Sequence, residues 1–299
     1  MQKVLIIYNP SSGSKNSTNI AEELNTILQN IEIITSVYAT TGDDNFKQLI
    51  SDHMAKGFDS VASLGGDGTV SKIVNAIATF ENRPKILLLP TGTMNNLARS
   101  LGLNLNIDKY LLGIEQGHFE TKEIDVGKIN DDYFISTVSV GSIPEMAWKT
   151  NEEHKENFGP LGYILDSFQV LNEEKTFDIQ IKADGQEESF EDVTLMIISI
   201  SNSVFGVQTF FEGTEIDDGY LHVYILKQGG LLTKMSTLTK DVLQNRQSNT
   251  VDHSYRGKFK EAIIDSNMTL NFALDGEKGP RMPARLEVLE KHLTFYIIK

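Results

Sequence analysis

Two short turns of small residues, each following an apolar run, constrain the fold of this chain more than any other feature. Residues 59–64 form one apolar run, and Gly65-Gly-Asp-Gly-Thr69 follows it directly. Residues 85–89 form another, followed by Pro90-Thr-Gly-Thr-Met-Asn-Asn96. Glycines let a backbone approach a polyanion closely, and exposed N–H groups in such turns bind phosphate oxygens. The two turns therefore predict a phosphate pocket built from strand-to-helix connections.

Asp67 places a carboxylate inside the first turn. An acid there repels a bare phosphate, so it suits a position beside a metal ion or a transferring proton. The turn has neither the Gly-Lys-Ser/Thr of a P-loop nor the third glycine of a dinucleotide fingerprint. A plain strand-to-helix connection is the alternative that the residues leave open.

The first half of the chain alternates between strand and helix patterns. We expect strands over 4–8, 31–39, 59–64 and 85–89, with helices that start near residue 17, span 43–56, follow residue 69 and span 97–101. Repeated βα units predict a mostly parallel sheet with helices on both faces. Ligands of such sheets lie at the carboxyl ends of the strands, where the turns 9–13, 65–69 and 90–95 fall.

The second half has a β-rich pattern. Short apolar runs cover 133–140, 177–183, 194–201, 221–226, 268–274 and 285–289, with turn signals between them. This pattern predicts an antiparallel sandwich. We therefore expect an α/β domain over 1–128, to which a closing strand within 290–299 returns, and a β-rich domain over 129–289.

Composition excludes several classes of protein. The formal net charge is −14 and the sequence pI is about 4.9, so general nucleic-acid binding is not expected. The chain has no cysteine, which excludes disulfides and thiolate metal sites. It shows no signal-peptide pattern and no run near the ~18 apolar residues of a membrane helix, so a cytoplasmic location is expected. The six histidines show no paired metal-ligand spacing, and His222 is interpreted as structural or as a surface residue.

Six motifs occur in order over nearly the whole chain. They are Asn9-Pro-Ser-Ser-Gly13, Gly65-Gly-Asp-Gly-Thr69, Pro90-Thr-Gly-Thr93 with Asn95, Ile124-Asp-Val-Gly127, Asp217-Asp-Gly-Tyr220 and Leu274-Asp-Gly-Glu277. As an ordered set they resemble the diacylglycerol kinase catalytic family, which includes bacterial lipid kinases, sphingosine kinases and ceramide kinases. NAD kinases share the Gly-Gly-Asp-Gly-Thr turn, but the Asp-Gly-Glu near the C-terminus is similar to the lipid-kinase branch.

The resemblance implies that ATP binds in the first domain. The residues that it places around the phosphates are Asn9, Pro10, Ser11, Ser12, Gly13, Gly65, Gly66, Asp67, Gly68, Thr69, Thr93 and Asn95. Thr41 matches a further nucleotide contact of the family. For Asn9 and Pro10, a simple strand-ending turn is the alternative.

The resemblance also assigns the chemistry to carboxylates. Phosphoryl transfer to a hydroxyl needs a carboxylate that accepts the hydroxyl proton. By resemblance Glu277 is this base, Asp275 is its catalytic neighbour, and Asp67 is a further acid of the site. Taken alone, an acidic pair that flanks a glycine favours a hairpin turn.

Asp67 and Asp125 match acids that the family places in an aspartate–water–magnesium network. Lipid kinases often carry Asn-Asp after the Gly-Thr turn, whereas this chain has Asn95-Asn96. Asn96 keeps an oxygen acceptor but lacks the charge, which weakens Mg²⁺ binding or shifts the metal preference.

A second, structural Mg²⁺ site is implied by the resemblance at Asp217-Asp-Gly-Tyr220. Its ligands are the carboxylate of Asp218 and the backbone oxygens of Glu215 and Tyr220. Hard oxygen ligands suit this ion. A turn without metal is the alternative.

These inferences predict a two-domain, ATP-dependent lipid kinase that transfers the γ-phosphate to a lipid hydroxyl in the cleft between its domains. The expected acceptor is diacylglycerol, and phosphatidic acid is the product. The expected partners are a membrane surface, contacted transiently and peripherally, and a second copy of the chain in a homodimer. The alternatives are a kinase for another lipid such as sphingosine, a kinase for a soluble substrate such as NAD, a nucleotide-binding regulator without transfer activity, and a β-sandwich scaffold.

Overall fold

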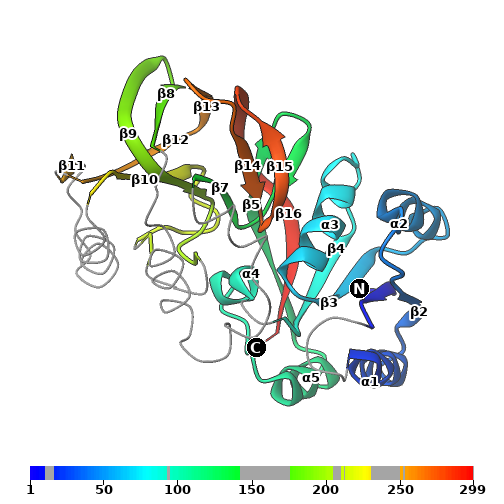
Figure 1. Cartoon of the computed structure of the whole chain (residues 1–299). Helices are drawn as coiled ribbons and strands as arrows, with labels where there is room; N and C mark the ends of the chain where they lie inside the picture. Colours follow the sequence, from blue (N-terminus) through cyan, green and yellow to red (C-terminus); the bar gives the residue numbers. More distant parts are fainter. Residues whose placement is uncertain are drawn as a thin grey trace. The chain divides into compact units, whose positions relative to one another are not determined.

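The structure is a computed structural model that describes residues 1–10, 17–92, 95–141, 176–204, 210–211, 213–229, 250–251 and 253–298 (Figure 1). The chain forms two compact units. The first consists of Met1–Ile124 with Lys291–Lys299, and the second of Asp125–Glu290. None of the helices in the described ranges is both long enough and apolar enough to cross a membrane.

The first unit is built on a parallel sheet. Its strands are β1 (Lys3–Tyr8), β2 (Ile34–Ala39), β3 (Ser60–Gly65) and β4 (Lys85–Pro90). They lie in the order β4-β3-β1-β2, and each neighbouring pair is parallel. The end of β16 (Ala284–Ile298) adds to this sheet, because Phe295 pairs in parallel with Ile86 of β4. The parallel sheet expected from the βα pattern is therefore present.

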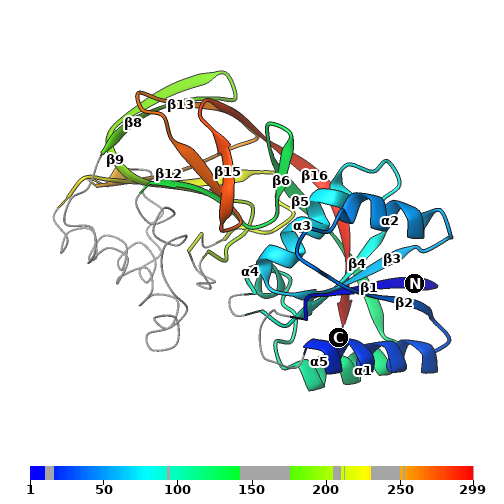
Figure 2. The ribbon, with the colours of Figure 1, turned by 45° about the vertical axis from the view of Figure 1, so that its right-hand side comes forward.

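Helices cover both faces of this sheet. They are α1 (Ser17–Asn30), α2 (Phe46–Met54), α3 (Asp67–Ala78), α4 (Asn96–Ser100) and α5 (Ile107–Glu115). Figure 2 shows α1 and α5 side by side on one face, and α2 and α3 on the other. The apolar stripe of α1 is buried as expected, with Leu24 and Leu28 fully inaccessible against the sheet.

Strand β2 lies at the edge of the sheet. Among the described strands it pairs only with β1. Its side chains include Ile34 and Val37, which are 56% and 45% exposed. The strand contains no charged residue, so its outer edge lacks the charges that usually guard such strands.

The second unit is antiparallel. Its strands are the end of β5 (Phe119–Ile129), β6 (Asp132–Phe134), β7 (Thr137–Gly141), β8 (Phe177–Ala183), β9 (Gln186–Ser199), β10 (Leu221–Lys227), β11 (Thr250–Val251), β12 (Ser254–Phe259), β13 (Glu261–Ser266), β14 (Asn271–Leu274), β15 (Glu277–Arg281) and the start of β16. The long strand β9 pairs with β8 through its first half, and with β7 and β10 through its second half. It therefore ties the antiparallel unit together.

Several expected strands differ from the observed ones, and two of these differences have a local cause. The strand expected from residue 31 begins at Ile34, because Glu32 adopts a left-handed conformation with φ of 63° where α1 ends. The run 133–140 divides into β6 and β7, because the N–H groups of Ile135 and Ser136 bind a side chain instead of a neighbouring strand. The run 194–201 is the end of the longer β9.

Several elements were not expected from the sequence, among them α5, β5, β12 and β13. The helix α5 has an N-cap residue, Asn106, whose side chain accepts a hydrogen bond from the N–H of Lys109. Its buried residues include Tyr110, Leu111 and Ile114, which is a short apolar stripe. Strand β5 follows α5. Its sequence alternates only weakly between charged and apolar residues, so it carries a weak strand signal.

Asp59 ties the start of β1 to the start of β3. Its carboxylate accepts hydrogen bonds from the N–H of Gln2 at 2.9 Å, from the N–H of Lys3 at 3.2 Å and from the hydroxyl of Ser60 at 2.8 Å. Partial burial raises the pKa of Asp59, but the hydrogen bonds from Ser60, Lys3 and Gln2 outweigh it, so this pKa lies below its ordinary value.

We therefore expect Asp59→Asn to lower the free energy of unfolding at neutral pH by about 1 kcal/mol, a value discounted because the side chain is partly exposed. A carboxylate with a lowered folded-state pKa stabilises the fold above its unfolded pKa and loses that contribution as the pH falls through the folded pKa. The difference in free energy of unfolding between wild type and variant should thus stay constant from pH 7 to pH 5. It should shrink only below about pH 4.

Chemical denaturation across this pH range measures this difference. Asp43→Asn, which removes an exposed carboxylate from the same unit, is the matched control and should leave stability unchanged. If this difference in free energy already narrowed between pH 7 and pH 5, it would contradict the lowered pKa of Asp59.

Candidate functional site

Three turns of the first unit meet at the carboxyl edge of its parallel sheet. The register pairs Tyr8 with Leu64 and Gly65 with Pro90, so β1, β3 and β4 end at the same level. The N–H of Asn9 donates to the backbone oxygen of Leu64 at 3.3 Å, which joins the first turn to the second. The topology therefore gathers the turns that the sequence singled out.

Two glycines make this closeness possible. A Cβ on Gly92 would lie 2.4 Å from the Cα of Gly66, a distance that atoms in proteins do not adopt. A Cβ on Gly65 would lie 2.5 Å from the Cβ of Thr69. The turns after β3 and β4 are thus in direct backbone contact, and no side chain fits between them.

Helix α3 begins immediately after this contact. Gly66 is its N-cap in an extended conformation, and Gly66–Thr69 are half-buried. The first N–H groups of a helix have no intrahelical acceptor and carry the positive end of the helix dipole. Backbone N–H groups at a glycine-lined helix start suit phosphate oxygens.

Asp67 and Asn95 hold this arrangement together. Oδ1 of Asp67 accepts the N–H of Asn96 at 3.1 Å, which links the start of α3 to the start of α4. Asn95 is left-handed, with φ of 51°, and only 9% exposed. Its Oδ1 accepts the N–H of Gly92 at 3.0 Å, and its Nδ2 donates to the oxygens of Gly92 at 2.7 Å and Pro90 at 3.4 Å. Asn95 therefore shapes the second turn from inside.

Comparison with known proteins agrees with these features. The family description "Diacylglycerol kinase catalytic domain" matches residues 3–129. A diacylglycerol kinase of Staphylococcus aureus (strain bovine RF122 / ET3-1) is 30% identical over 296 residues, which cover 99% of this chain and 92% of that protein. The chain belongs to the diacylglycerol kinase family.

Other members of the diacylglycerol kinase family agree along the whole chain. A diacylglycerol kinase of Staphylococcus epidermidis (strain ATCC 12228 / FDA PCI 1200) is 30% identical over 301 residues, covering 100% of this chain and 93% of that protein. The crystal structure of a diacylglycerol kinase from Bacillus anthracis strain Sterne superposes with a TM-score of 0.79 at 26% identity, covering 98% and 96% of the two chains. The protein is therefore a phosphotransferase with an alcohol acceptor, and it has the fold of this family.

The carboxylate of Asp275 binds backbone N–H groups of a segment that is distant in the sequence, and we call this arrangement the clamp of Asp275. Its Oδ1 accepts the N–H groups of Ser136 at 2.9 Å and Thr137 at 3.0 Å, and its Oδ2 accepts that of Ile135 at 3.1 Å. Its own N–H donates to the oxygen of Thr137 at 2.8 Å. The carboxylate predicted as a catalytic neighbour is thus engaged in positioning the hairpin that carries Glu277.

Glu277 is differently placed on the same hairpin. Asp275 and Gly276 have φ values of 48° and 91° and form the two-residue turn between β14 and β15, where Leu274 pairs with Glu277. The hairpin expected from the local sequence is therefore confirmed. Glu277 is the exposed first residue of β15, so its carboxylate is accessible to a reactant.

The predicted metal residues of the second unit lie around one turn. Asp125 is 2% exposed, and its Oδ2 accepts the N–H of Gly219 at 2.7 Å. Oδ1 of Asp218 accepts the N–H of Tyr220 at 3.1 Å, and its Oδ2 contacts Nε2 of His222 at 2.9 Å. Sequence reasoning did not connect His222 with this turn, although its spacing of four residues from Asp218 was visible.

The structure does not bring all predicted ligands into one cluster. Within the described ranges, no three His, Asp or Glu side chains form a group able to hold a metal ion. Asp67 belongs to the first unit and Asp125 to the second. Their metal-binding roles therefore remain predictions.

Thr41 lies in a loop closed by Asp44. The carboxylate of Asp44 accepts the N–H of Thr41 at 2.8 Å, its hydroxyl at 3.0 Å, and the hydroxyl of Tyr38 at 2.7 Å. Burial raises the pKa of Asp44, but the hydrogen bonds from Tyr38, Thr41 and Gly42 lower it further than burial raises it. The loop is fixed from within, and the nucleotide contact of Thr41 remains a prediction.

The structure describes some of the remaining predicted nucleotide contacts and not others. Asn9 and Pro10 follow β1, and the hydroxyl of Ser17 in α1 donates to the oxygen of Asn9 at 2.9 Å. Gly68 and Thr69 lie in the first turn of α3. Ser11, Ser12, Gly13 and Thr93 lie outside the described residues.

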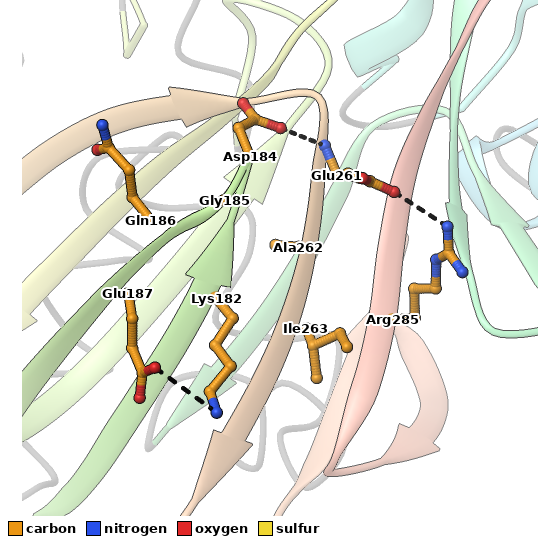
Figure 3. A pocket seen from close by; sticks show the side chains of 9 residues that line it. All are labelled: Lys182, Asp184, Gly185, Gln186, Glu187, Glu261, Ala262, Ile263 and Arg285. Atoms are coloured by element: carbon orange, nitrogen blue, oxygen red, sulfur yellow. Dashed lines mark hydrogen bonds and ion pairs between the residues drawn. The ribbon is translucent and has the colours of Figure 1, made fainter.

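A cavity of about 420 Å³ on the second unit is not part of this site (Figure 3). Its charged residues pair with one another, with Lys182 Nζ 3.6 Å from Glu187 and Arg285 3.0 Å from Glu261. None of the predicted site residues is among the described residues that line it. The third carboxylate, Asp184, accepts the backbone N–H groups of Lys260 and Glu261, so each charged side chain of the cavity is engaged by the protein.

The glycine contact yields a first test of the site. Gly92→Ala inserts a methyl group where Gly66 leaves no room, so we expect a lower thermal midpoint and at least tenfold weaker ATP binding, measured by calorimetry. Gly66→Ala is the matched control for folding, because its Cβ would have an ordinary 3.5 Å contact. Equal stability and ATP affinity of Gly92→Ala and wild type would contradict the observed packing.

The clamp of Asp275 yields a second test. Asp275→Asn replaces one acceptor oxygen by an NH₂ group that faces a donor, so we expect a loss of about 1–3 kcal/mol of folding free energy. Urea unfolding measures this loss. Asp265→Asn is the matched control, because Asp265 is exposed and accepts the N–H of its neighbour Ser266 instead of N–H groups from a distant segment. If Asp275→Asn lost turnover with unchanged stability, Asp275 would act on the reactants rather than on the backbone.

Proposed function

We propose that this chain transfers the γ-phosphate of MgATP to the hydroxyl of diacylglycerol, producing phosphatidic acid and ADP. The observation that carries the proposal is the similarity to named diacylglycerol kinases over 99% of the chain, combined with the glycine contact between Gly66 and Gly92. The family supports the reaction class, and the acceptor and the donor nucleotide are inferred from it.

In this proposal the first unit binds the phosphates of ATP. The backbone at Gly66–Gly68 donates N–H groups to the phosphate oxygens, because the glycines let a polyanion approach and α3 begins there, whereas the N–H of Thr69 donates to the oxygen of Gly66. Positioned donors of this kind also stabilise the charge that develops on the transferring group. Asn95 and Asp67 keep the two turns in place through the hydrogen bonds described above.

Glu277 acts as the base. As the lipid oxygen bonds to the γ-phosphorus, the hydroxyl proton passes to the Glu277 carboxylate and the bond to the ADP oxygen breaks. The exposed position of Glu277 at the start of β15 and the clamped hairpin beneath it support this role.

The residues present fit a catalytic Mg²⁺. The ion is usually held by one or two carboxylates together with substrate phosphates, and Asp67 is a half-buried acid within the glycine turn. Asp67 would hold it together with the substrate phosphates, and the bound ion would neutralise charge on them. Asn96 has no charge to add to this set.

The acceptor lies in a bilayer, so we also propose transient contact with a membrane surface. With a formal net charge of −14, such contact depends on a local patch and not on the whole surface. Another lipid alcohol, such as sphingosine, is the second candidate acceptor, because single methylene groups alter acceptor choice by only ~1–3 kcal/mol.

Labelled ATP, Mg²⁺ and mixed micelles of diacylglycerol test the proposal, followed by extraction with organic solvent. Label in phosphatidic acid is the expected result. If the label appeared in another lipid from a total lipid extract, that lipid would be the acceptor in place of diacylglycerol. Label that appeared only in the aqueous phase, with NAD as substrate, would overturn the assignment of a lipid acceptor.

Glu277→Gln tests the base in the same assay. We expect turnover to fall by roughly 10²–10⁴-fold, while ATP affinity and the thermal midpoint stay at the wild-type values. Glu191→Gln makes the same chemical change at an exposed position of β9 and should keep full turnover. Near-normal turnover of Glu277→Gln would refute the assignment.

A further inference from the structure

The side chain of His222 connects the two ends of the turn Thr214–Tyr220, which precedes β10. Nε2 of His222 lies 2.9 Å from Oδ2 of Asp218, and Nδ1 of His222 lies 3.3 Å from the hydroxyl of Thr214. The side chains of His222 and Asp218 are only 13% and 23% exposed, and Thr214 is 6% exposed. The imidazole therefore bridges the two ends of this turn in a largely buried position.

One tautomer of the imidazole fits both contacts. With its proton on Nε2 the ring donates to the Asp218 carboxylate, and Nδ1 accepts from the Thr214 hydroxyl. The ring also lies against Phe211, with 5.9 Å between ring centroids. Both ring nitrogens of His222 therefore have a partner within the protein.

The rest of the turn is also held by protein groups. The N–H of Gly219 donates to Asp125 at 2.7 Å, and the N–H of Asp125 donates to the oxygen of Ile216 at 3.0 Å. The N–H of Asp218 donates to the oxygen of Glu215 at 3.3 Å. Each of these bonds fixes the turn without an ion.

Two of the three groups that the family resemblance assigns to a structural Mg²⁺ already bind N–H groups here, and the charged one does not suit the ion. Both carboxylate oxygens of Asp218 accept N–H groups, from Tyr220 and from His222. The backbone oxygen of Glu215 accepts the N–H of Asp218. A hard cation needs oxygens that face it, whereas the N–H of His222 points at the oxygen that would have to supply the charge.

We propose that His222 takes the place of a structural cation in this chain, so that the turn Thr214–Tyr220 folds without Mg²⁺. The requirement for a catalytic Mg²⁺ at Asp67 is separate. The inference therefore does not rest on the proposed function, and it is tested without nucleotide or lipid.

Thermal unfolding of the full chain in EDTA and in millimolar Mg²⁺ tests the proposal. Wild type should have the same midpoint in both. His222→Leu removes the donor, so its midpoint in EDTA should fall by roughly 2–6 °C. Mg²⁺ should recover part of this loss, because the released oxygen of Asp218 becomes free to bind it.

Three further variants sharpen the test. His222→Gln keeps an N–H donor and should stay near wild type, and the double variant His222→Leu with Asp218→Asn should lose the recovery by Mg²⁺. His292→Leu is the matched control, because His292 belongs to the first unit, where its Nε2 lies 3.0 Å from the backbone oxygen of Ala78. It should lower the midpoint without creating a response to Mg²⁺.

Two results would overturn the proposal. One is a midpoint of the wild type that rises with Mg²⁺ and no longer rises in Asp218→Asn. The other is a wild-type midpoint that rises with Mn²⁺ or Zn²⁺ and no longer does so in His222→Leu, because His222 would then be a metal ligand instead of a replacement for one.

Discussion

The approach of two backbones at Gly66 and Gly92 is the constraint on which the first unit depends. The parallel register brings β3 and β4 to the same level, so their turns must either touch or diverge. Glycine at position 92 lets them touch, and Asn95 then fixes the second turn by bonding to its backbone. The result is a surface of backbone N–H groups at the start of α3, which is the chemistry that a polyphosphate requires.

Aspartates that accept backbone N–H groups recur through this acidic chain. Asp59 ties β1 to β3, Asp275 holds the segment before β7, and Asp125 holds the turn before β10. Each satisfies N–H groups from a distant part of the chain, and a buried N–H without a partner is costly. The position of an acid within a kinase-like motif therefore does not by itself show that the acid takes part in the reaction. Asp275 and Glu277 are two residues apart, yet Asp275 binds the backbone whereas Glu277 is exposed.

How far the sequence predicts this protein depends on the range of the interactions. The βα order, the stripe of α1 and the glycine turns follow from local patterns, and they were expected. The role of Asp275 did not follow, because its partners lie 138–140 residues away and nothing near Leu274-Asp-Gly-Glu277 indicates them. Helix α5 and the pair Asp218–His222 carried local signals, an N-cap asparagine and a four-residue spacing, that a closer analysis would have used.

The bare edge of β2 has a consequence for the protein in concentrated solution. Its outer N–H and C=O groups, with Ile34 and Val37 beside them, form a template on which another extended chain can add. The negative charge of the molecule keeps copies apart at low ionic strength, and salt shortens the range of that repulsion to about 8–10 Å at physiological ionic strength. Colloidal stability should therefore decline as salt rises, and a lysine within β2 would restore it more directly than further charge elsewhere.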